Sequence, residues 1–470
     1  MTNNRKRGIR MTQLTEDFLK NIKHIHFIGI GGSGMFPLVQ ILHKEGFLIT
    51  GSDNNESDTL ELERKMGIEI KMGHSPENLA GAELVVYTAA IMSDNPELCA
   101  AKEKDIPMAE RSVMLGLITR RYSNAVCVCG THGKTTTTSM ITQILLDAGL
   151  DPSAVIGGKL ASIGGNGRAG KSDTLVCEAC EFVDTFLKLA PDVAVILNID
   201  ADHLDYFKTM ENLIASFRKF AQMTTKALIF NGEDANTLKA VEGLSKPRIT
   251  FGWNESNDYY PQNIRYRSGV QTDFDLYYRG EKLCSVCLHV PGRHNILNAV
   301  AACAAALFSG ASPENLVRGL GNFRGAGRRF EVLYHENGIT VADDYAHHPA
   351  ELTATLKAAK EMDFKRVWAV FQPFTYSRTA MLLDDFAKAL SIADKVVMSE
   401  IMGSREKNTY NIYTKDLAAK IDGSVWFDTF EEIAAYVVAN AEPGDLIITL
   451  GCGDIYKAAK LMIKKYRERS

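Results

Sequence analysis

One glycine-rich segment, Gly130-Thr131-His132-Gly133-Lys134-Thr135-Thr136, carries the residue types of a phosphate-binding loop. It follows an apolar run at residues 125–129 that is typical of a buried strand. Such a loop turns backbone N–H groups toward phosphate oxygens, while its lysine reaches the β- and γ-phosphates and its threonine hydroxyl binds Mg²⁺. Val128 stands where the strict motif has its first glycine. The position directly after a strand nevertheless predicts an ATP site.

A second glycine-rich turn lies closer to the N-terminus and matches the pattern G-x-G-x-x-G. It stands between an expected strand at 24–28 and an expected helix at 35–46, and an acidic residue ends the next strand. In this setting the glycines permit a tight turn, the helix N-terminus attracts a diphosphate, and the acid accepts ribose hydroxyls. A turn used only for packing is the alternative. The residues predicted to hold a nucleotide diphosphate are Gly29, Gly31, Gly32, Ser33, Gly34, Ser52 and Asp53.

Polar residues follow two further expected strands, at 174–177 and 193–197. Glu178 comes directly after the first, and the polar segment 198–205 follows the second. Ligands of parallel α/β sheets gather beyond the carboxyl ends of the strands, and Mg²⁺ prefers hard oxygen ligands. Glu178 and His203 are therefore candidate metal ligands. A solvated loop is the open alternative for the second segment.

A third polar cluster, Asp343-Asp344-Tyr345-Ala346-His347-His348, follows an expected short strand at 339–342. Two carboxylates and two imidazoles this close could bind zinc, but their spacing fits no zinc-ligand pattern. A contact with a substrate or nucleotide is the preferred interpretation, and an exposed turn stays open. The pairs Cys177/Cys180 and Cys284/Cys287 are not expected to share a metal or form a redox couple, because strand residues three apart point to opposite faces.

These clusters need a scaffold, and apolar β-rich runs alternate with helical stretches along almost the whole chain. This pattern is typical of α/β domains with mostly parallel sheets. A new series of strands starts near residue 125, and the glycine cluster at 321–327 is typical of a linker. We expect three domains, at 1–122, 123–325 and 326–470, with a β-rich insertion at 259–290 and an alanine-rich helix at 296–308.

Composition limits the class of protein. The 470 residues are 46% hydrophobic and 23% charged, which excludes a disordered or fibrous chain. A formal net charge of −4 argues against a protein that binds nucleic acid by neutralising its phosphates. No apolar stretch follows the basic residues 1–10, and no apolar run approaches the length of a membrane span. We expect a cytoplasmic protein with reduced thiols, with Met11 as an alternative start that would make residues 1–10 a mobile tail.

Five motifs in this chain resemble, in order, those of the Mur ligase family. They are Gly-Ile-Gly-Gly-Ser-Gly-Met, Gly-Thr-His-Gly-Lys-Thr-Thr-Thr-Thr, Asn-Ile-Asp-Ala-Asp-His-Leu-Asp, Pro-Gly-Arg-His-Asn-Ile-Leu-Asn-Ala and Asp-Asp-Tyr-Ala-His-His-Pro. The likeness covers residues 24–460 and therefore all three expected domains. Five ordered motifs are more specific than either glycine loop alone.

The resemblance implies a Rossmann-like N-terminal domain that holds the UDP part of a substrate. It implies a central P-loop ATPase-like domain and a C-terminal Rossmann-like α/β domain that closes over ATP and brings an amino acid. The implied ligands are ATP, Mg²⁺, UDP-N-acetylmuramate and L-alanine, joined through an acyl phosphate, with neither nucleic acid nor a membrane as partner. The oligomeric state stays open, and the base that accepts a proton from the amine cannot be named from the sequence.

The resemblance also implies roles for single residues. Lys134 and Thr135 would serve ATP and Mg²⁺, and Glu178 and His203 would hold the metal. The other implied contacts are Asn295 at the adenine, Arg329 at the γ-phosphate, Asp344 at the ribose, and His348 and Arg378 near the amino-acid carboxylate. The family commonly has Glu-Ala-Asp-Glu where this chain has Glu178-Ala179-Cys180-Glu181, which removes one carboxylate.

Three other functions compete with this one. A non-catalytic nucleotide-sensing protein is disfavoured, because the metal and phosphate residues are all intact. A related ligase that joins a preformed peptide to the same sugar nucleotide would carry the same motifs. An NAD-dependent oxidoreductase would explain the turn at 29–34 and Asp53. It would leave Lys134 and Thr135 without a purpose.

Overall fold

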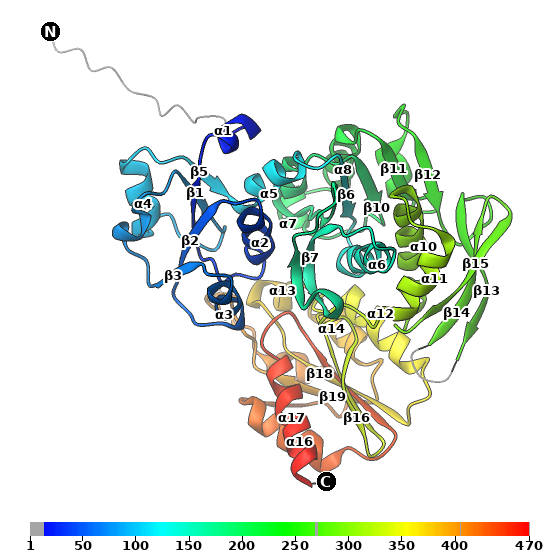
Figure 1. The fold of residues 1–470 in the computed structure, drawn as a ribbon. Coiled ribbons are helices and arrows are strands. Elements are labelled where there is room, and N and C mark those ends of the chain that lie inside the picture. The colour runs from blue at the N-terminus through cyan, green and yellow to red at the C-terminus, as the bar shows by residue number, and fades with distance from the viewer. Residues whose placement is uncertain (1–13, 268–270, 405, 470) are drawn as a thin grey trace.

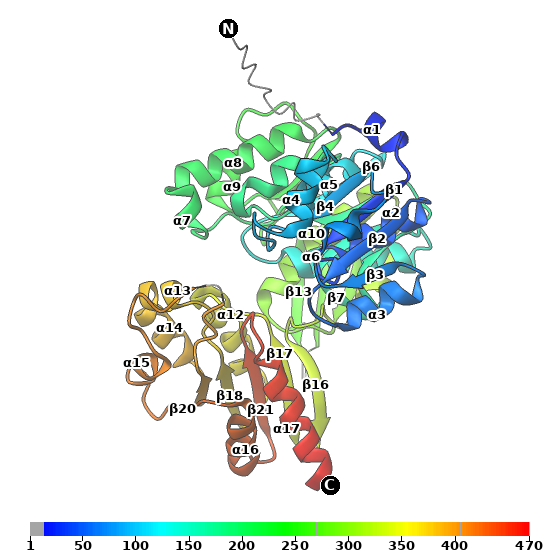
Figure 2. The same ribbon diagram turned by 90° about the vertical axis from the view of Figure 1, so that its left-hand side faces the viewer.

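The computed structural model describes residues 14–267, 271–404 and 406–469, without the side chains of Asp205 and Arg469. The basic leader 1–10 and the alternative start at Met11 lie outside the described residues. The chain has a three-domain α/β architecture in which each domain is built on its own sheet (Figure 1). The first two domains lie side by side, and the C-terminal domain lies below them in Figure 2.

The N-terminal sheet has five parallel strands in the order β3-β2-β1-β4-β5. Its strands are β1 His24–Ile28, β2 Leu48–Asp53, β3 Glu69–Met72, β4 Leu84–Tyr87 and β5 Met108–Glu110. Its helices are α1 Glu16–Lys20, α2 Phe36–Lys44, α3 Asp58–Lys65, the 3-10 helix η1 Pro76–Leu79, α4 Pro96–Glu103 and α5 Arg111–Thr119. The strand order reverses beside β1, and such a switch point opens a crevice at the carboxyl edge of the sheet, where the glycine-rich turn after β1 lies.

The central sheet has ten strands in the order β15-β14-β13-β12-β11-β10-β6-β9-β7-β8, with antiparallel hairpins at both edges. Its strands are β6 Asn124–Cys129, β7 Ser153–Leu160, β8 Gly165–Arg168, β9 Thr174–Glu178, β10 Val193–Ile196, β11 Ala227–Asn231, β12 Arg248–Phe251, β13 Tyr259–Tyr266, β14 Thr272–Tyr278 and β15 Glu281–Leu288. Its helices are α6 Lys134–Asp147, α7 Leu204–Phe207, α8 Met210–Met223, α9 Ala235–Val241, α10 Arg293–Phe308 and α11 Pro313–Asn322, with 3-10 helices η2 Ala161–Ile163 and η3 Phe182–Lys188.

The C-terminal sheet has six strands in the order β16-β17-β21-β18-β19-β20, all parallel except the edge strand β16. Its strands are β16 Glu331–Glu336, β17 Ile339–Asp344, β18 Arg366–Phe371, β19 Lys395–Ser399, β20 Val425–Phe427 and β21 Asp445–Leu450. Its helices are α12 Pro349–Lys360, α13 Tyr376–Met381, α14 Leu383–Leu390, α15 Thr414–Ala418, α16 Phe430–Asn440 and α17 Tyr456–Arg469. Within the described ranges, no helix is long and apolar enough to cross a membrane.

The expected elements are largely present, with one difference at the second linker. The insertion expected at 259–290 forms β13–β15, and the alanine-rich helix is α10. Gly321 and Asn322 form the end of α11 instead of a linker, and the extended segment begins at Phe323. Helix α11 can continue through Gly321 because it packs on α6 and β15 and so gains tertiary contacts that outweigh the low helix propensity of glycine.

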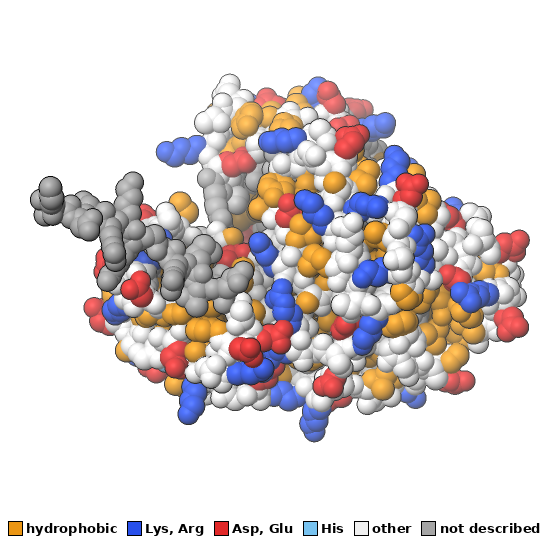
Figure 3. Space-filling view, turned by 90° about the horizontal axis from the view of Figure 1, so that it is seen from above, with side chains coloured by type: hydrophobic (Ala, Val, Ile, Leu, Met, Phe, Trp, Pro, Cys, Tyr) orange, Lys and Arg blue, Asp and Glu red, His pale blue; other side chains and the backbone are white. Residues whose placement is uncertain are grey.

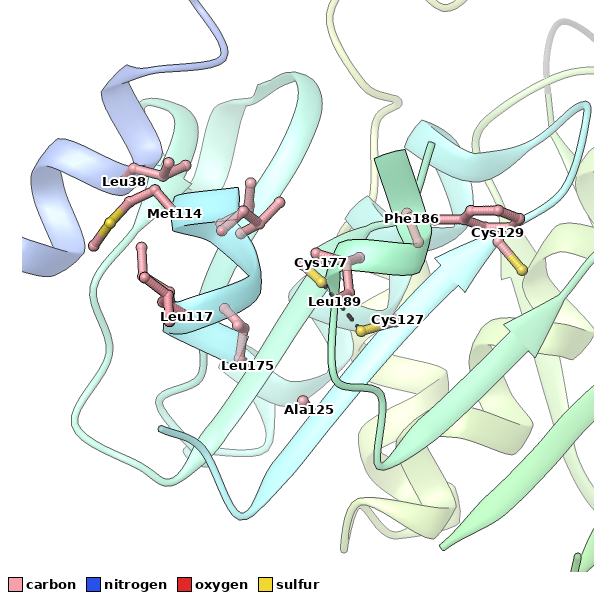
Figure 4. Close-up of a cluster of buried hydrophobic side chains, with 14 of the residues drawn as sticks. Leu38, Met114, Leu117, Ala125, Cys127, Cys129, Leu175, Cys177, Phe186 and Leu189 are labelled. Atoms are coloured by element: carbon pink, nitrogen blue, oxygen red, sulfur yellow. Dashed lines mark hydrogen bonds between the residues drawn. The ribbon is translucent and has the colours of Figure 1, made fainter. Parts of the chain in front are cut away.

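The first two domains share one hydrophobic core. Buried side chains of α2 and α5, such as Leu38 and Met114, join Cys127 of β6 and Leu175 of β9 in a single cluster (Figure 4). The Sγ atoms of Cys127 and Cys177 lie 3.3 Å apart within it. The C-terminal domain instead has two clusters of its own, one on each face of its sheet.

Polar contacts reinforce the boundary between the first two domains. Nζ of Lys44 in α2 donates to the carbonyl oxygens of Ala169 (2.7 Å) and Gly170 (2.6 Å). Nδ2 of Asn166 in β8 donates to the carbonyl oxygen of Ser33 at 2.6 Å. These bonds cross from one domain to the other and hold the glycine-rich turn against β8.

Charged side chains of both signs are interspersed over the described part of the face seen in Figure 3. An extended basic stripe, which a phosphate backbone would require, is absent from that part of the face. The distribution agrees with the near-balance of charge in the sequence, with 53 Lys and Arg against 57 Asp and Glu.

Candidate active site

The loop between β6 and α6 depends on two glycines. Gly130 (φ +139°) and Gly133 (φ +88°) adopt backbone conformations that favour glycine. A Cβ atom on Gly133 would lie 2.4 Å from Oδ1 of Asn298, and one on Gly130 would lie 2.9 Å from Cβ of Leu197. The loop therefore runs tightly over α10 and the end of β10, and it presents the N-terminus of α6 to a cavity, which is a favourable place for phosphate.

Lys134, the first residue of α6, is held inside this loop. Its Nζ donates to the carbonyl oxygens of Gly130 (2.6 Å) and Thr131 (3.1 Å) and to Oε1 of Glu181 (3.1 Å). Burial alone would lower the pKa of Lys134, but the Glu181 carboxylate raises it above its usual range. The ammonium group is therefore a stable cation beside the loop.

Glu178 ends β9 beside the first turn of α6. Its Oε2 accepts hydrogen bonds from Oγ1 of Thr135 (2.9 Å) and from the N–H of Gly157 (2.8 Å). A Cβ atom on Gly157 would lie 2.5 Å from that oxygen, so the close approach requires glycine. The hydroxyl and the carboxylate are hard oxygen donors, and they suit Mg²⁺, which binds through one or two carboxylates together with substrate phosphates and water.

The polar segment after β10 fastens the phosphate loop to the neighbouring strand. Oδ1 of Asn198 accepts a hydrogen bond from the N–H of His132 (2.8 Å), and Nδ2 of Asn198 donates one to the carbonyl oxygen of His132 (3.1 Å). The N–H of Asp200 donates to Oγ1 of Thr131 at 2.9 Å. These bonds link the carboxyl ends of β6 and β10, where a parallel sheet presents its ligands.

His203 lies in the same cavity as Glu178 but forms no metal cage with it. Its φ is +55°, its Nε2 is 3.7 Å from Oδ2 of Asp202, and its ring centroid is 4.7 Å from that of Phe182. Among the described residues, no group of three His, Cys, Asp or Glu side chains is arranged to hold a metal ion. The sequence-based assignment of His203 as a ligand therefore stays a prediction.

The cavity above the loop has a volume of about 610 Å³ and lies between the central and C-terminal domains. Residues of both domains form its wall. The predicted residues among them are Thr131, His132, Gly133, Lys134, Thr135, Thr136, Glu178, His203 and Asn295 from the central domain, with Arg329 and Asp344 from the linker and the C-terminal domain. Apolar side chains of Phe251 and Phe330 line the same space. Such a mixed cavity can bury an adenine ring and hold a charged phosphate chain.

Asp344 ends β17 and fixes the linker beside this cavity. Its carboxylate oxygens accept hydrogen bonds from the N–H groups of Phe330 (2.8 Å) and Ala346 (2.7 Å). Burial raises the pKa of Asp344 to about 6, although the Arg329 cation and these N–H groups lower it. The ribose contact expected for Asp344 stays a prediction, and its present bonds are to the backbone.

Asn295 occupies the opposite wall in α10. Its Nδ2 donates to the carbonyl oxygen of Pro291 at 2.6 Å, and its Oδ1 accepts a hydrogen bond from Asn298 at 3.0 Å. Both ends of the amide are therefore engaged within the protein. An adenine contact by Asn295 would use a remaining lone pair or N–H, and it stays a prediction.

The two residues expected near the amino-acid carboxylate lie outside the lining of this cavity. His348 is the N-cap of α12, where its Nδ1 accepts a hydrogen bond from the N–H of Ala350 at 3.4 Å. Arg378 lies in α13. The neighbouring residue His347 does line the cavity.

A smaller cavity of about 360 Å³ lies between the N-terminal and central domains. Gly32, Ser33 and Gly34 line it from the glycine-rich turn, and the guanidinium-bearing side chain of Arg111 packs over Gly34. A phosphate at this place would meet the N-terminus of α2 and an arginine.

The other residues predicted to bind the nucleotide diphosphate do not line this cavity, but they hold the glycine-rich turn in its conformation. Gly29 has φ +76°, and the N–H of Gly31 donates to Oδ2 of Asp53 at 3.0 Å. Ser52 is fully buried and donates to Oε2 of Glu97 at 2.6 Å. Asp53 and Ser52 thus hold the turn in place, and a direct substrate contact by either stays a prediction.

Glu178 and Cys180 line both cavities. An acid bound in the smaller cavity and a nucleotide bound in the larger one would therefore meet at the end of β9. The carboxylate of Glu178 lies at this junction, and Lys134 lines the larger cavity beside it.

Comparison with known proteins identifies the class. Residues 24–123 match the family model described as the Mur ligase catalytic domain, residues 128–306 the Mur ligase middle domain, and residues 328–453 the glutamate ligase domain of Mur ligases. The chain belongs to the Mur ligase family, whose members are ATP-dependent ligases.

Two similar curated proteins and one similar solved structure have the same name. The chain is 45% identical to the UDP-N-acetylmuramate–L-alanine ligase of Caldanaerobacter subterraneus, over 96% of this chain and 99% of that protein. It is 46% identical to the protein of the same name from Acetivibrio thermocellus, over 97% and 98%. The solved structure of UDP-N-acetylmuramate-alanine ligase from Thermotoga maritima has 28% identity and a TM-score of 0.81, covering 96% of this chain and all of that one.

Sequence reasoning missed several residues of the site. Glu181 pairs with Lys134, and its place three residues after Glu178 was an available signal. His347 was quoted in a motif, but nothing in the sequence distinguished it from His348. Gly157 left no signal, because its contact with Glu178 arises only when β7 pairs with β9.

Proposed function

We propose that this protein is an ATP-dependent ligase that joins L-alanine to the carboxylate of UDP-N-acetylmuramate through an acyl phosphate. The observation that carries the proposal is the pair of cavities that meet at Glu178. One cavity adjoins a diphosphate-type glycine turn, and the other adjoins a phosphate loop. The names of relatives about 45% identical over almost the full length support these substrates.

The reaction needs both cavities for a chemical reason. A carboxylate does not react with an amine in water, because its oxygen is a poor leaving group. Transfer of the γ-phosphoryl group from ATP forms an acyl phosphate, from which phosphate can leave. Such a transfer depends on positioning and on neutralising charge, which Lys134 and Arg329 supply in this proposal. Closure of the C-terminal domain would then keep water from the acyl phosphate.

The phosphate-binding side of the site also suits Mg²⁺. Thr135 and Glu178 bring a hydroxyl and a carboxylate oxygen together at 2.9 Å, a partial ligand set that phosphate oxygens and water would complete. We propose these two as ligands, with His203 as a third group in the same cavity. When bound, the cation would neutralise charge on the transferring phosphoryl group.

The alternative functions receive less support. A ligase for a preformed peptide would share the cavities, but the relatives of highest identity cited above are named for L-alanine. An oxidoreductase would not require the contacts of Lys134, Thr135 and Glu178 at the second cavity. A cytoplasmic location is part of the proposal, because ATP and sugar nucleotides are cytoplasmic metabolites.

Phosphate release from ATP in the presence of UDP-N-acetylmuramate tests the proposal, with each amino acid and with a tripeptide supplied in turn. We expect release that depends on L-alanine. Release with the tripeptide alone would assign the peptide ligase instead. Release with no amine at all would contradict both assignments.

A further inference from the structure

The proposed ligase reaction, on which this inference rests, requires a proton acceptor. A free amino acid carries an ammonium group at neutral pH, and its nitrogen has no lone pair until a proton has left. A base must therefore lie in the cavity that receives both the acyl phosphate and the amine. Lys134 and Arg329 are cations, and the carboxylate oxygens of Asp344 already accept backbone N–H bonds. The other residues assigned to this cavity are candidate metal ligands, phosphate-loop residues or an amide, and none of them suits this role.

His347 has the geometry of such a base. It follows β17 and lines the larger cavity together with Lys134 and Arg329. Its Nδ1 lies 3.0 Å from the carbonyl oxygen of Tyr345 and 3.2 Å from Oε2 of Glu351. Both neighbours accept hydrogen bonds, so Nδ1 carries the proton and Nε2 keeps its lone pair.

Glu351 is fixed as the ionised partner. Its Oε2 also accepts hydrogen bonds from the N–H groups of His347 (3.0 Å) and His348 (3.3 Å) at the start of α12. Burial alone would raise the pKa of Glu351, but His347, Arg329 and the N–H group hold it at about 2. A carboxylate in this position selects the tautomer of the imidazole and stabilises the imidazolium that forms when a proton arrives.

The adjacent histidine has the opposite tautomer. Nδ1 of His348 accepts a hydrogen bond from the N–H of Ala350, so the proton of its neutral ring lies on Nε2. A ring in this form has no free lone pair to offer. The two histidines therefore differ in chemistry although they are neighbours in sequence, and only their local hydrogen bonds make the difference.

The groups around His347 keep it neutral and ready to accept a proton. Burial lowers its pKa, as do the guanidinium groups of Arg378 in α13 and Arg329 in the linker, while Glu351 raises it. His132 of the phosphate loop acts on the pair through Glu351. The ring is therefore largely unprotonated at neutral pH.

We propose that His347 is the general base of the amine-attack step and that Glu351 is its positioning residue. Nε2 of His347 takes one proton from the amino-acid ammonium group. The freed nitrogen lone pair then forms a bond to the acyl carbon, and the carbonyl electron pair moves to its oxygen. When the carbonyl re-forms, the carbon–oxygen bond to phosphate breaks, and the departing phosphate takes the second amine proton.

Hydroxylamine separates this role from a structural one. It is uncharged at neutral pH, so it can attack an acyl phosphate without a base and give a hydroxamate. Formation of the acyl phosphate itself does not use His347. The experiment compares ADP release by the wild type and by His347→Gln with UDP-N-acetylmuramate and either L-alanine or hydroxylamine as the nucleophile.

We expect His347→Gln to lower alanine-dependent turnover by about 10²–10⁴-fold, the usual contribution of a general base, and to keep hydroxylamine-dependent turnover within about threefold of the wild type. In this variant, alanine-dependent turnover should no longer fall at acidic pH as it does in the wild type, so the acidic limb of the pH profile is lost. Equal losses with both nucleophiles, or a retained acidic limb, would overturn the proposal. A wild-type enzyme that releases ADP with hydroxylamine but not with alanine would contradict the proposed function instead.

A matched variant of the neighbouring histidine serves as the control. His348→Asn keeps a good N-cap for α12, and it should retain the acidic limb even if the KM for alanine changes. Glu351→Gln should lower alanine-dependent turnover less than His347→Gln does, because the base remains but loses its charged partner. Loss of the acidic limb in His348→Asn, with its retention in His347→Gln, would assign the base to His348.

Discussion

The molecule has two interdomain boundaries, and they are built in opposite ways. Between the N-terminal and central domains, apolar side chains of α2, α5, β6 and β9 form one continuous core (Figure 4). Between the central and C-terminal domains lies a cavity of about 610 Å³ whose wall mixes charged, polar and apolar side chains, and the C-terminal domain keeps its apolar clusters within itself. In Figure 2 the first two domains lie side by side, and the C-terminal domain lies below them.

The difference assigns a mechanical role to each boundary. Separating the first two domains would expose apolar surface at a cost of about 25 cal/mol per Å². Opening the second boundary divides no such shared core, because the buried clusters of the C-terminal domain include no side chains of the first two domains. In the proposed reaction, the first two domains would therefore form a fixed platform that presents the acid, and the C-terminal domain would move with ATP and the amino acid.

The largest expected effect tests whether one cavity binds the sugar nucleotide and the other supports phosphoryl transfer from ATP. Lys134→Ala should lower turnover by about 10³-fold or more, because phosphoryl transfer depends on neutralising charge. Binding of UDP-N-acetylmuramate should change little, since Lys134 does not line the first cavity. Calorimetric titration with the sugar nucleotide, beside steady-state kinetics, measures both.

Removal of Lys134 also leaves the buried Glu181 carboxylate without its cation, which is destabilising in itself. The double variant Lys134→Ala/Glu181→Gln removes that charge and serves as the control. If the double variant lost turnover and sugar-nucleotide binding equally, the sugar nucleotide and ATP would not bind in separate cavities as proposed.

A smaller effect tests how tightly the first boundary is packed. A Cβ atom on Gly116 in α5 would lie 2.1 Å from the carbonyl oxygen of Lys188 in the central domain. Gly116→Ala should therefore lower the free energy of unfolding by about 1–3 kcal/mol through overpacking, although alanine favours helices. Urea unfolding followed by circular dichroism measures the change.

Gly321 in α11, next to the second boundary, offers a matched comparison. A Cβ atom there would meet nothing within 4 Å. Gly321→Ala should raise stability by as much as about 1 kcal/mol, the ordinary helix-propensity gain. If both substitutions were stabilising, the first boundary would be looser than its core indicates.

The pH dependence of stability probes the second boundary. The pKa of Asp344 is about 6 in the folded protein, above its ordinary value of 3.8, so the folded state binds this proton more tightly than the unfolded state does. The resulting contribution to the free energy of unfolding is fully present below pH 3.8 and is lost as the pH rises through 6. Relative to Asp344→Asn, the wild type should lose ~1–3 kcal/mol of unfolding free energy between pH 4 and pH 7. Denaturant unfolding of the two proteins across this range measures the difference in unfolding free energy. Parallel curves of stability against pH would contradict the raised pKa of Asp344.

The smallest effect concerns the hydrogen bond from Asn166 to Ser33. Asn166→Ala removes a contact of about 0.5–1.5 kcal/mol between β8 and the glycine-rich turn. The KM for the sugar nucleotide should rise about two- to tenfold, with kcat and the KM for ATP unchanged. A change in the KM for ATP alone would mean that the turn does not serve the first cavity.

Local patterns made much of this protein predictable. The strand at His24–Ile28 has the expected bounds, because a continuous apolar run before turn residues specifies a buried parallel strand. The phosphate loop was predictable for a similar reason, since two glycines, a lysine and a threonine after a strand form a local unit. The end of α11 was not, because its packing against α6 and β15 decides where the helix stops.

The sequence by itself determined the fold class, the order of the elements and the family, because these depend on periodicity and on short motifs. Only the tertiary structure decided which of two adjacent histidines lines the cavity, that Glu181 holds Lys134, and that Glu178 lines both cavities. Side-chain conformations at the start of α12 set the first property, and the packing of β9 beside α6 sets the other two. The spacing of residues along the sequence specifies neither. The same holds for the boundaries, since a shared core and an open cavity arise only when the three domains pack together.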